Sequence, residues 1–403
     1  MKRMQSVKKA LAIVAVCCGG LLFAQPAVSE PGVTDDTILM GSLMAVSGPP
    51  SLMGKAATSA LKVWQKDVNA NGGINGRKLK LITADDGYVP ARTRQMAKKL
   101  IENDKVFALV GTSGSSHLLA AMSVIDKHKV PAINTMAVNS AHFNPPRDSV
   151  FVAGATYCQE IEIAMTYAAK NLGKQDAKFV LIYQDDEFGK DMKCGYDNGI
   201  KNNGLADVGQ FKFKRGQKDF SAEILKAKAT GANVLISGGI VAEHAIFLKE
   251  ARKIGWDMTL IGMHGAHLSA VQALSGEADN GYYTADYVPP LSATDIPGVK
   301  KFMELSKKYL TEKEIKGLNR YALSSYAAAL MMEHAMRECG KELTRACVIQ
   351  NLENMDGFDV GGVMSPITYG KGNRFSVSGI MVIQSNGLGK DFKRISDPIV
   401  LAE

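Results

Sequence analysis

The feature that most constrains the fold is an alternation of short apolar runs with amphipathic stretches of helical length. In the first part of the chain the apolar runs are TILMGSLMAV, KLKLITADD, VFALVG and VPAINT, and helical periodicity fills residues 55–69, 92–103 and 118–128 between them. A strand–helix–strand order of this kind predicts a parallel sheet with helices on its faces.

The same order starts again in the middle of the chain. Helical periodicity covers residues 159–171, 188–204 and two stretches that end at residues 229 and 254, and these alternate with KFVLIYQDD, QFKFK, ANVLISGG and MTLIGM. No low-complexity linker separates the two sets, and 403 residues are too many for one ordinary core. We therefore predict two α/β units. Ligands of such sheets bind beyond the carboxyl ends of the strands, so the loops that follow the strands are the places to search.

The first 29 residues have the features of an export leader. A basic start precedes an apolar run at residues 10–24 that is too short for a membrane span, and Ala27-Val28-Ser29 places small residues before Glu30. Val16 before Cys17 fits a lipoprotein cleavage box poorly, so we expect no lipid anchor. The chain is predicted to be periplasmic after cleavage.

The charge distribution and the missing metal-binding motifs limit the kinds of partner and cofactor to expect. The leader holds four basic residues and no acid, so the net charge of +8 falls to +4 on cleavage. The remaining basic residues are mixed with acidic ones, which predicts no nucleic-acid partner. There is no CxxC or HExxH motif, so we expect neither metal nor cofactor.

The mature chain keeps four cysteines, and an oxidising compartment favours disulfides. The spacing of CGKELTRAC predicts a pair between Cys339 and Cys347, which leaves Cys158 with Cys194. For the second pair, two buried thiols remain an equally good interpretation.

The loop in VGTSGSSHLLAA lies between a predicted strand and a predicted helix. A phosphate-binding P-loop ends in Gly-Lys-Ser/Thr, but Ser116 and His117 stand there, and the G-x-S-x-G elbow of hydrolases lacks its closing glycine. Two interpretations remain. Either Ser115 and Ser116 hold a ligand carboxylate at the helix N-terminus, or one of them only caps the helix. The acid pairs Asp85-Asp86 and Asp185-Asp186 are predicted to act in caps and turns.

Several motifs in a fixed order carry a resemblance to a known family. They are SLMAVSGPPSLMGKAATSALKVWQKDVNANGGINGRKLKLITADDG, GTSGSS, VPAINTMA, DDEFGKD, GQKDFSAEI, ANVLISGG and GVMSPITYGKGN. Together they resemble the periplasmic leucine/isoleucine/valine-binding proteins, the type I solute-binding components of ABC importers. The resemblance implies an α/β fold of two Rossmann-like lobes with parallel sheets, joined by three crossovers and closing on a ligand. It predicts one lobe from residues 30–155 and 288–366 and another from residues 156–287 and 367–403.

The resemblance also implies ligand-binding positions. Ser115, between Gly114 and Ser116, matches the serine that holds the amino acid's carboxylate. Met136 and Val138 match the segment where a backbone carbonyl and a threonine bind the ammonium, although Val138 has no hydroxyl. Further expected ligand positions are those at which this chain differs from the family: Met53 and Phe188 in place of tyrosines that flank the side chain, Ile240 in place of a tyrosine at the entrance, and His264 in place of a glutamate beside the ammonium.

The histidine at position 264 bears on the ligand class. A buried ammonium needs an acceptor to offset its lost hydration, and no acid is expected at this position. A carboxylate without an amino group, aromatic or branched, would suit such a site. The alternatives are a shift in the alignment, or an acid supplied by Glu243 or Asp86.

The resulting expectation is a monomeric binding protein, not an enzyme, that captures a small-molecule ligand and delivers it to a membrane ABC permease. Two alternatives stay open: an amide- or small-molecule-sensing receptor of the same fold, and a secreted α/β hydrolase.

Overall fold

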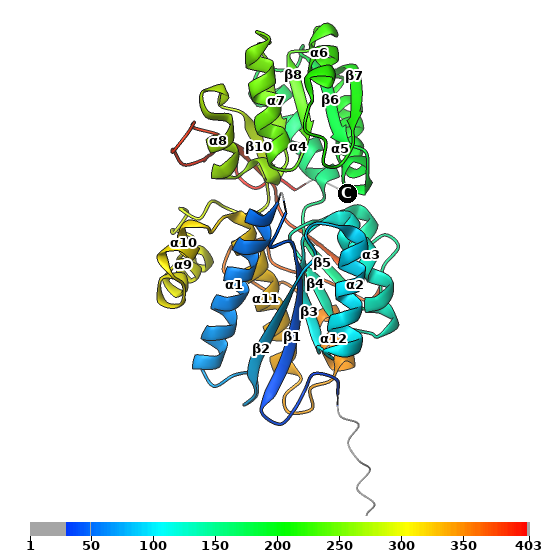
Figure 1. Cartoon of the computed structure of the whole chain (residues 1–403), viewed down its shortest axis with the longest axis vertical. Coiled ribbons are helices and arrows are strands. Elements are labelled where there is room, and N and C mark those ends of the chain that lie inside the picture. Colours follow the sequence, from blue (N-terminus) through cyan, green and yellow to red (C-terminus); the bar gives the residue numbers. More distant parts are fainter. Residues whose placement is uncertain (1–29, 49, 401–403) are drawn as a thin grey trace, which may run out of the picture.

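The structure is a computed structural model that describes residues 30–48 and 50–400, so the predicted leader lies outside the described residues. The chain forms two α/β lobes, one above the other in Figure 1, each built on one sheet. Within the described ranges, none of the helices is both long enough and apolar enough to cross a membrane.

The first lobe contains a six-stranded sheet that is parallel throughout, in the order β2-β1-β3-β4-β5-β11. Its strands are β1 (Thr37–Met44), β2 (Lys78–Asp85), β3 (Ala108–Thr112), β4 (Ala132–Asn134), β5 (Val150–Gly154) and β11 (Phe375–Val377). Its helices are α1 (Ser51–Ala70), α2 (Pro90–Lys98), α3 (Ser115–Lys127), α9 (Pro297–Tyr309), α10 (Glu312–Lys316), α11 (Arg320–Glu338) and α12 (Arg345–Glu353). Figure 1 shows α1 beside α11 on one flank of this sheet and α2 beside α3 on the other.

The second lobe contains a seven-stranded sheet in the order β7-β6-β8-β9-β10-β12-β13. Its strands are β6 (Lys178–Gln184), β7 (Ala206–Phe213), β8 (Val234–Gly238), β9 (Thr259–Gly262), β10 (Tyr283–Asp286), β12 (Met381–Gln384) and β13 (Lys393–Arg394). The strands from β7 to β10 are parallel, whereas β12 and β13 add an antiparallel edge. Its helices are α4 (Tyr157–Asn171), α5 (Glu187–Asn203), α6 (Ser221–Ala229), α7 (Ala242–Lys253) and α8 (Ser269–Ser275).

The chain passes between the lobes three times, as expected, but the third passage is later than predicted. It crosses after β5, after β10, and between β11 and β12. The predicted boundary at residue 366 is wrong because Phe375–Val377 pair in parallel with Val152–Gly154 and so extend the first sheet.

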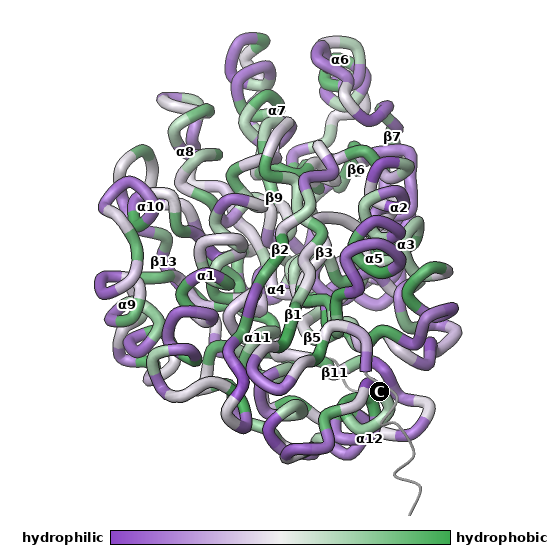
Figure 2. The backbone as a smooth tube through the Cα atoms, turned by 60° about the horizontal axis from the view of Figure 1, so that its bottom comes forward, coloured by the Kyte–Doolittle hydropathy of each residue, from purple (hydrophilic) through white to green (hydrophobic). Residues whose placement is uncertain are grey.

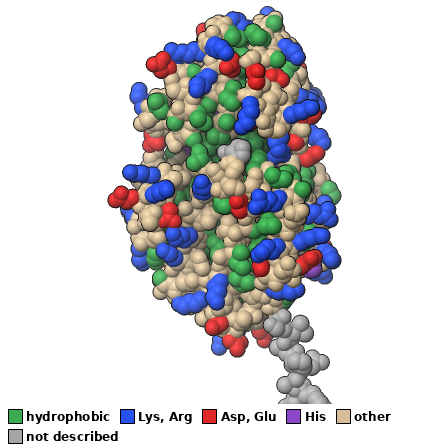
Figure 3. Space-filling view, viewed as in Figure 1, with side chains coloured by type: hydrophobic (Ala, Val, Ile, Leu, Met, Phe, Trp, Pro, Cys, Tyr) green, Lys and Arg blue, Asp and Glu red, His purple; other side chains and the backbone are tan. Residues whose placement is uncertain are grey.

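Apolar strands form the core of both lobes. Every residue of β3, β5 and β8 is buried, in keeping with strands that are covered by helices on both faces. Figure 2 shows hydrophobic colour along inner strands such as β5 and hydrophilic colour on the outer turns of helices. On the face drawn in Figure 3, basic and acidic side chains are interspersed over both lobes.

Candidate functional site

Loops at the carboxyl ends of both sheets meet between the lobes and enclose a cavity of about 320 Å³. The first lobe lines it with Pro50 and residues 87–89, and the second lobe with Arg215, Ile240 and Glu243, among others. A cavity of about 410 Å³ elsewhere is lined only by first-lobe elements around α1, α9 and α11. The cavity near Arg215 is therefore built by both lobes, and it lies beyond the carboxyl ends of strands, where ligands of such sheets bind.

The three serines of the GTSGSS loop have three different environments. The hydroxyl of Ser113 accepts a hydrogen bond from the backbone N–H of Ala45 at 2.7 Å, so it holds two loops of the first lobe together. Ser116 accepts from Nη2 of Arg215 in the second lobe at 3.1 Å. Ser115 is 3% exposed, and its Oγ has no hydrogen-bond partner among the described residues.

The start of α3 distinguishes between the two interpretations of this loop. Gly114 occupies the N-cap, and in the described part of the chain no side chain caps the helix. Plain capping by Ser115 or Ser116 is therefore wrong for this structure. The free N–H groups and the free hydroxyl of Ser115 form a site that favours an anion.

Tyr88 packs over this helix start. Its ring stacks on His117 with centroids 4.1 Å apart, and a Cβ on Gly114 would lie 3.0 Å from the Tyr88 ring and 2.5 Å from Nδ1 of His117. Only glycine fits here without displacing the two rings. Burial lowers the pKa of His117 to about 4, so the imidazole is neutral at pH 7.

Arg215 reaches from the loop after β7 into the space between the lobes. Its guanidinium pairs with Asp186, which caps α5, and lies 5.2 Å from the centre of the Tyr88 ring. Nη1 of Arg215 is buried and has no partner within residues 30–48 and 50–400. Nη2 of Arg215 is therefore bonded within the protein, whereas Nη1 has no hydrogen-bond partner among the described residues.

An aromatic cluster lies where the two lobes meet, and its residues are not among those that line the cavity. Tyr157, the first residue of α4, meets the edge of Phe188 with centroids 4.7 Å apart and stacks near His264 at 5.3 Å. Tyr287 and Tyr321 approach the His264 ring edge-on at 5.4 and 5.8 Å. The cluster combines residues of both lobes with the chain that crosses between them.

His264 is paired with a buried acid, contrary to the expectation that this position lacks one. Nδ1 of His264 lies 2.7 Å from Oε1 of Glu160, and the His264 backbone N–H donates to Oε2 at 2.8 Å. Burial raises the pKa of Glu160 well above its usual range and lowers that of His264. The pair is therefore driven toward zero net charge.

The two acids suggested as alternatives have other roles. One oxygen of Glu243 accepts from the backbone N–H groups of Ile240 and Val241. Asp86 accepts from the N–H of Tyr88 and the hydroxyl of Thr93, which is the turn role predicted for it.

A second buried charge network lies where β10 leads into the first lobe. Arg320, at the start of α11, binds both oxygens of Asp286 at 3.0 and 2.8 Å, and Nδ1 of His267 lies 2.7 Å from Oδ2. Burial alone would raise the pKa of Asp286, but the Arg320 charge and the His267 hydrogen bond hold it below its usual range. Nη1 of Arg320 is buried and without a partner in the part of the chain described.

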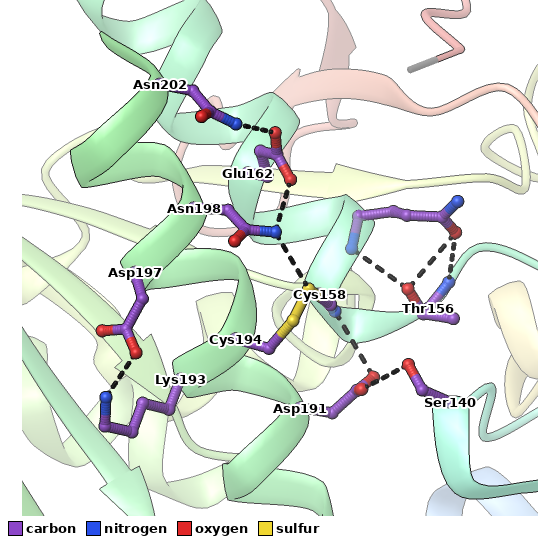
Figure 4. Close-up of a disulfide and its surroundings, with 11 residues drawn as sticks. Ser140, Thr156, Cys158, Glu162, Asp191, Lys193, Cys194, Asp197, Asn198 and Asn202 are labelled. Carbon is purple, nitrogen blue, oxygen red and sulfur yellow. Dashed lines mark hydrogen bonds and ion pairs between the residues drawn. A yellow bond between two sulfur atoms is a disulfide. The ribbon is translucent and has the colours of Figure 1, made fainter. Parts of the chain in front are cut away.

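Both cysteine pairs are joined, including the one left open by the sequence. Cys158–Cys194 ties the first turn of α4 to α5, and Figure 4 shows Asp191 next to it. Asp191 accepts from the backbone N–H of Cys158 and, across the lobes, from the hydroxyl of Ser140 at 2.6 Å. The disulfide therefore fixes the helices that carry Tyr157 and Phe188.

The predicted ligand positions lie in several different surroundings. Val138 contacts the region of Gly154 and Tyr287, and Ile240 lines the cavity. The sulfur of Met136 points toward Gly111, inside the first lobe, and Met53 is buried in the hydrophobic core. Sequence reasoning did not single out Tyr88 and Arg215, which lie in loops that follow strands, nor Asp286 at the end of β10. It also missed residues in the first turns of α4 and α11: Tyr157, Glu160, Arg320 and Tyr321.

Two α/β lobes that are joined by three crossings and share one site between them define a solute-binding protein. The chain matches the periplasmic binding protein family model over residues 37–390 and belongs to that family. This confirms the family and the fold predicted from the sequence. Members of the family are solute-binding proteins rather than enzymes, and membership implies an extracytoplasmic place of action.

Individual relatives agree with this assignment. The chain is 26% identical over 358 residues to "Leu/Ile/Val-binding protein homolog 7" of Brucella suis, covering 86% of each chain. A branched-chain amino acid ABC transporter protein from Thermus thermophilus with bound valine superposes with a TM-score of 0.81 at 20% identity, covering 92% of this chain and 98% of that one. A solute-binding protein from Rhodopseudomonas palustris in complex with 3,4-dihydroxybenzoic acid gives 0.76 at 20% identity, with coverage of 90% and 97%. At this level of identity the structures show the shared fold.

Proposed function

We propose that this protein is the extracytoplasmic binding component of an ABC importer and that it captures a small carboxylate-bearing solute between its lobes. The ligand would be a branched-chain or other apolar amino acid, or an aromatic or branched organic acid. The partners would be this ligand and a membrane ABC permease, with the protein acting as a monomer after removal of its leader.

The observation that carries the proposal is the buried, unpartnered hydroxyl of Ser115 at the start of α3. A buried polar group without a partner costs about 1–3 kcal/mol, and a ligand carboxylate would remove that cost. The positive end of the helix dipole favours the same anion. The titles of the relatives add support, because valine and 3,4-dihydroxybenzoic acid both carry a carboxylate.

Contacts between the lobes support capture by hinge closure. Ser116 bonds to Arg215, Ser140 to Asp191, and the Asn139 amide donates to the carbonyl of Glu187 at 2.9 Å. All three are polar contacts between the lobes, of the kind that water can replace when the lobes separate.

The hydrolase alternative needs a serine that is activated by a histidine. The Ser115 hydroxyl has no partner in the described residues, and the nearby His142 ring bonds to the Ser115 carbonyl instead, at 3.0 Å. A sensing receptor would bind its ligand in the same place, and only the partner would differ.

The test is calorimetric titration with a panel of apolar amino acids and organic acids, using Ser115→Ala and, as control, Ser221→Ala. Ser221 also begins a helix, α6, but in the second lobe and outside the cavity. Loss of a hydrogen bond to a charged group should weaken binding by about 1.5–3 kcal/mol, or roughly 10- to 150-fold, in Ser115→Ala alone. Unchanged affinity in Ser115→Ala would place the carboxylate elsewhere.

A further inference from the structure

Glu243 lines the cavity between the lobes from the first turn of α7. Its Oε2 atom accepts from the backbone N–H groups of Ile240 and Val241 at 3.1 and 3.3 Å. Within residues 30–48 and 50–400, its Oε1 atom accepts no hydrogen bond, and no cation pairs with the carboxylate. The role of Glu243 in this turn therefore leaves one oxygen of its carboxylate free.

Other acceptors near the site are engaged or do not reach the cavity. Three acids bond to side chains of the chain itself and do not line the cavity: Glu160, Asp186 and Asp286. Both ring nitrogens of His117 lack a partner in the described part of the chain, so this neutral imidazole also has a free acceptor. His117 is 0% exposed, however, and Tyr88, whose ring stacks on it, lines the cavity instead. Glu243 is therefore the acceptor that a ligand in the cavity meets.

The cation that lines this cavity does not neutralise Glu243. It is Arg215, and its guanidinium pairs with Asp186 of the same lobe instead. Val89 and Ile240 give the cavity apolar walls on its two sides, one from each lobe. A ligand with a wholly apolar body would fit these walls, but it would exclude water from the free oxygen of Glu243 without supplying a donor. An acceptor that is buried and left unsatisfied in this way costs free energy.

We infer, resting on the proposed function, that Glu243 selects among carboxylate ligands, because its free oxygen accepts a hydrogen bond from a donor group, ammonium or hydroxyl, on the body of the ligand. The carboxylate of the same ligand lies at Ser115 and the start of α3. A carboxylate oxygen accepts and cannot donate, so only a ligand that carries such a donor satisfies Glu243. A site built around a hydrogen bond discriminates strongly against an analogue without the donor, since the group of the protein is then left unpaired. The cavity therefore rejects acids whose body is wholly apolar.

The experiment compares two matched series of acids by calorimetry at pH 7. One series is 4-methylpentanoate, 2-hydroxy-4-methylpentanoate and leucine, and the other is benzoate, 4-hydroxybenzoate and 4-(aminomethyl)benzoate. In a series that binds, an acid with a donor should bind at least about tenfold more tightly than the acid without one. Equal or tighter binding of the donor-free acid would overturn this inference and leave the proposed function standing. If no acid of either series binds but the neutral 4-methylpentanamide or benzamide does, the proposed function itself fails.

Glu243 is tested by Glu243→Gln and Glu243→Ala, with Glu223→Gln as control. Glu223 is also an acid in the first turn of a second-lobe helix, α6, but it does not line the cavity. Glu243→Gln keeps an acceptor oxygen and removes the charge, so it should weaken binding of the ammonium ligand at least about tenfold and that of the hydroxyl ligand less.

Glu243→Ala should abolish the preference for donor-bearing acids, and Glu223→Gln should leave it unchanged. The ratio of the two affinities within one variant separates this role from a structural one, because a loosened turn would weaken donor-bearing and donor-free acids alike. A preference that persists in both Glu243 variants, with an unchanged melting temperature, would overturn the inference and point to another acceptor such as His117.

Discussion

Removing the charge of Asp286 should destabilise both lobes at once. Asp286 is the last residue of β10 in the second sheet, and its partner Arg320 begins α11 on the first lobe. Their side chains are 0% and 1% exposed, so solvent does not screen the pair. The Asp286→Asn substitution keeps the shape of the side chain and leaves the guanidinium buried without its counter-charge.

The size of the effect follows from the geometry. Two unit charges 2.8 Å apart attract by about 6 kcal/mol at an effective dielectric constant of about 20. Part of this attraction is offset by the desolvation that the pair has already undergone, so breaking such a pair typically costs about 3–5 kcal/mol. That is a large fraction of the roughly 5–15 kcal/mol by which a domain is stable.

The two tryptophans allow each lobe to be followed separately. Trp64 lies in α1 of the first lobe, and Trp256 lies between α7 and β9 of the second. Urea unfolding of Trp64→Phe and Trp256→Phe backgrounds, read by fluorescence, should show both transitions shifted by Asp286→Asn. The Asp185→Asn control breaks an exposed pair and should cost at most about 1 kcal/mol.

A loss below about 1 kcal/mol in Asp286→Asn would refute the reasoning, because it would mean that Arg320 finds another partner or water. A shift confined to one tryptophan would refute the link between the lobes. Adding Arg320→Met should recover part of the loss, since the uncompensated charge is then gone.

Three further predictions concern a buried acid, the two disulfides and the start of α3. Burial raises the pKa of Asp191 from the usual 3.8 to about 6, so the folded state binds this proton more tightly than the unfolded state does. The free energy of unfolding should therefore fall by up to about 3 kcal/mol as the pH rises from about 4 to about 6. Urea titrations across this pH range should show that this pH dependence of the free energy of unfolding is absent in Asp191→Asn. The disulfides Cys158–Cys194 and Cys339–Cys347 close loops of 36 and 8 residues. Loop closure therefore predicts that Cys158→Ser/Cys194→Ser loses about 4 kcal/mol of stability and Cys339→Ser/Cys347→Ser about 2.5 kcal/mol. Chemical denaturation that gave the reverse order would contradict this. Gly114→Ala should cost about 1–3 kcal/mol of stability because its Cβ collides with the rings of His117 and Tyr88, and a melting temperature equal to that of the parent would rule out this overlap.

Periodicity predicted the architecture because the repeating units are long enough to leave a pattern. The runs that became β1, β2, β3, β6 and β8 are apolar and flanked by turn residues, and each is followed by an amphipathic helix. The third crossing was misplaced because β11 has three residues, too few for a period of two to be visible. Its assignment depends on pairing with β5, which is a long-range contact.

The sequence predicted residues of the candidate site only where they lie in a recognisable loop motif. Ser115 lies in a glycine–serine turn between a strand and a helix, and this local motif is what singled it out in the sequence. Arg215 lies in KRGQKD, a polar turn that looks like solvated surface until β7 and the opposite lobe bring it beside Ser116. Arg320 is separated from Asp286 by 34 positions, and nothing local indicates their pairing.

Position 264 shows why the identity of one residue does not determine the charge of a site. The sequence places a histidine there, and the structure adds Glu160 from a different helix directly against it. An acid is therefore present, yet burial and the histidine drive the pair toward zero net charge, so it offers a ligand no free negative charge. If the site lacked an acid altogether, one new carboxylate would be expected to restore a preference for amino acids. In this site, His264→Glu would instead place two buried carboxylates together, and they would repel each other until one took up a proton. The charge at this position therefore depends on Glu160 and His264 together, and not on the residue at one aligned position.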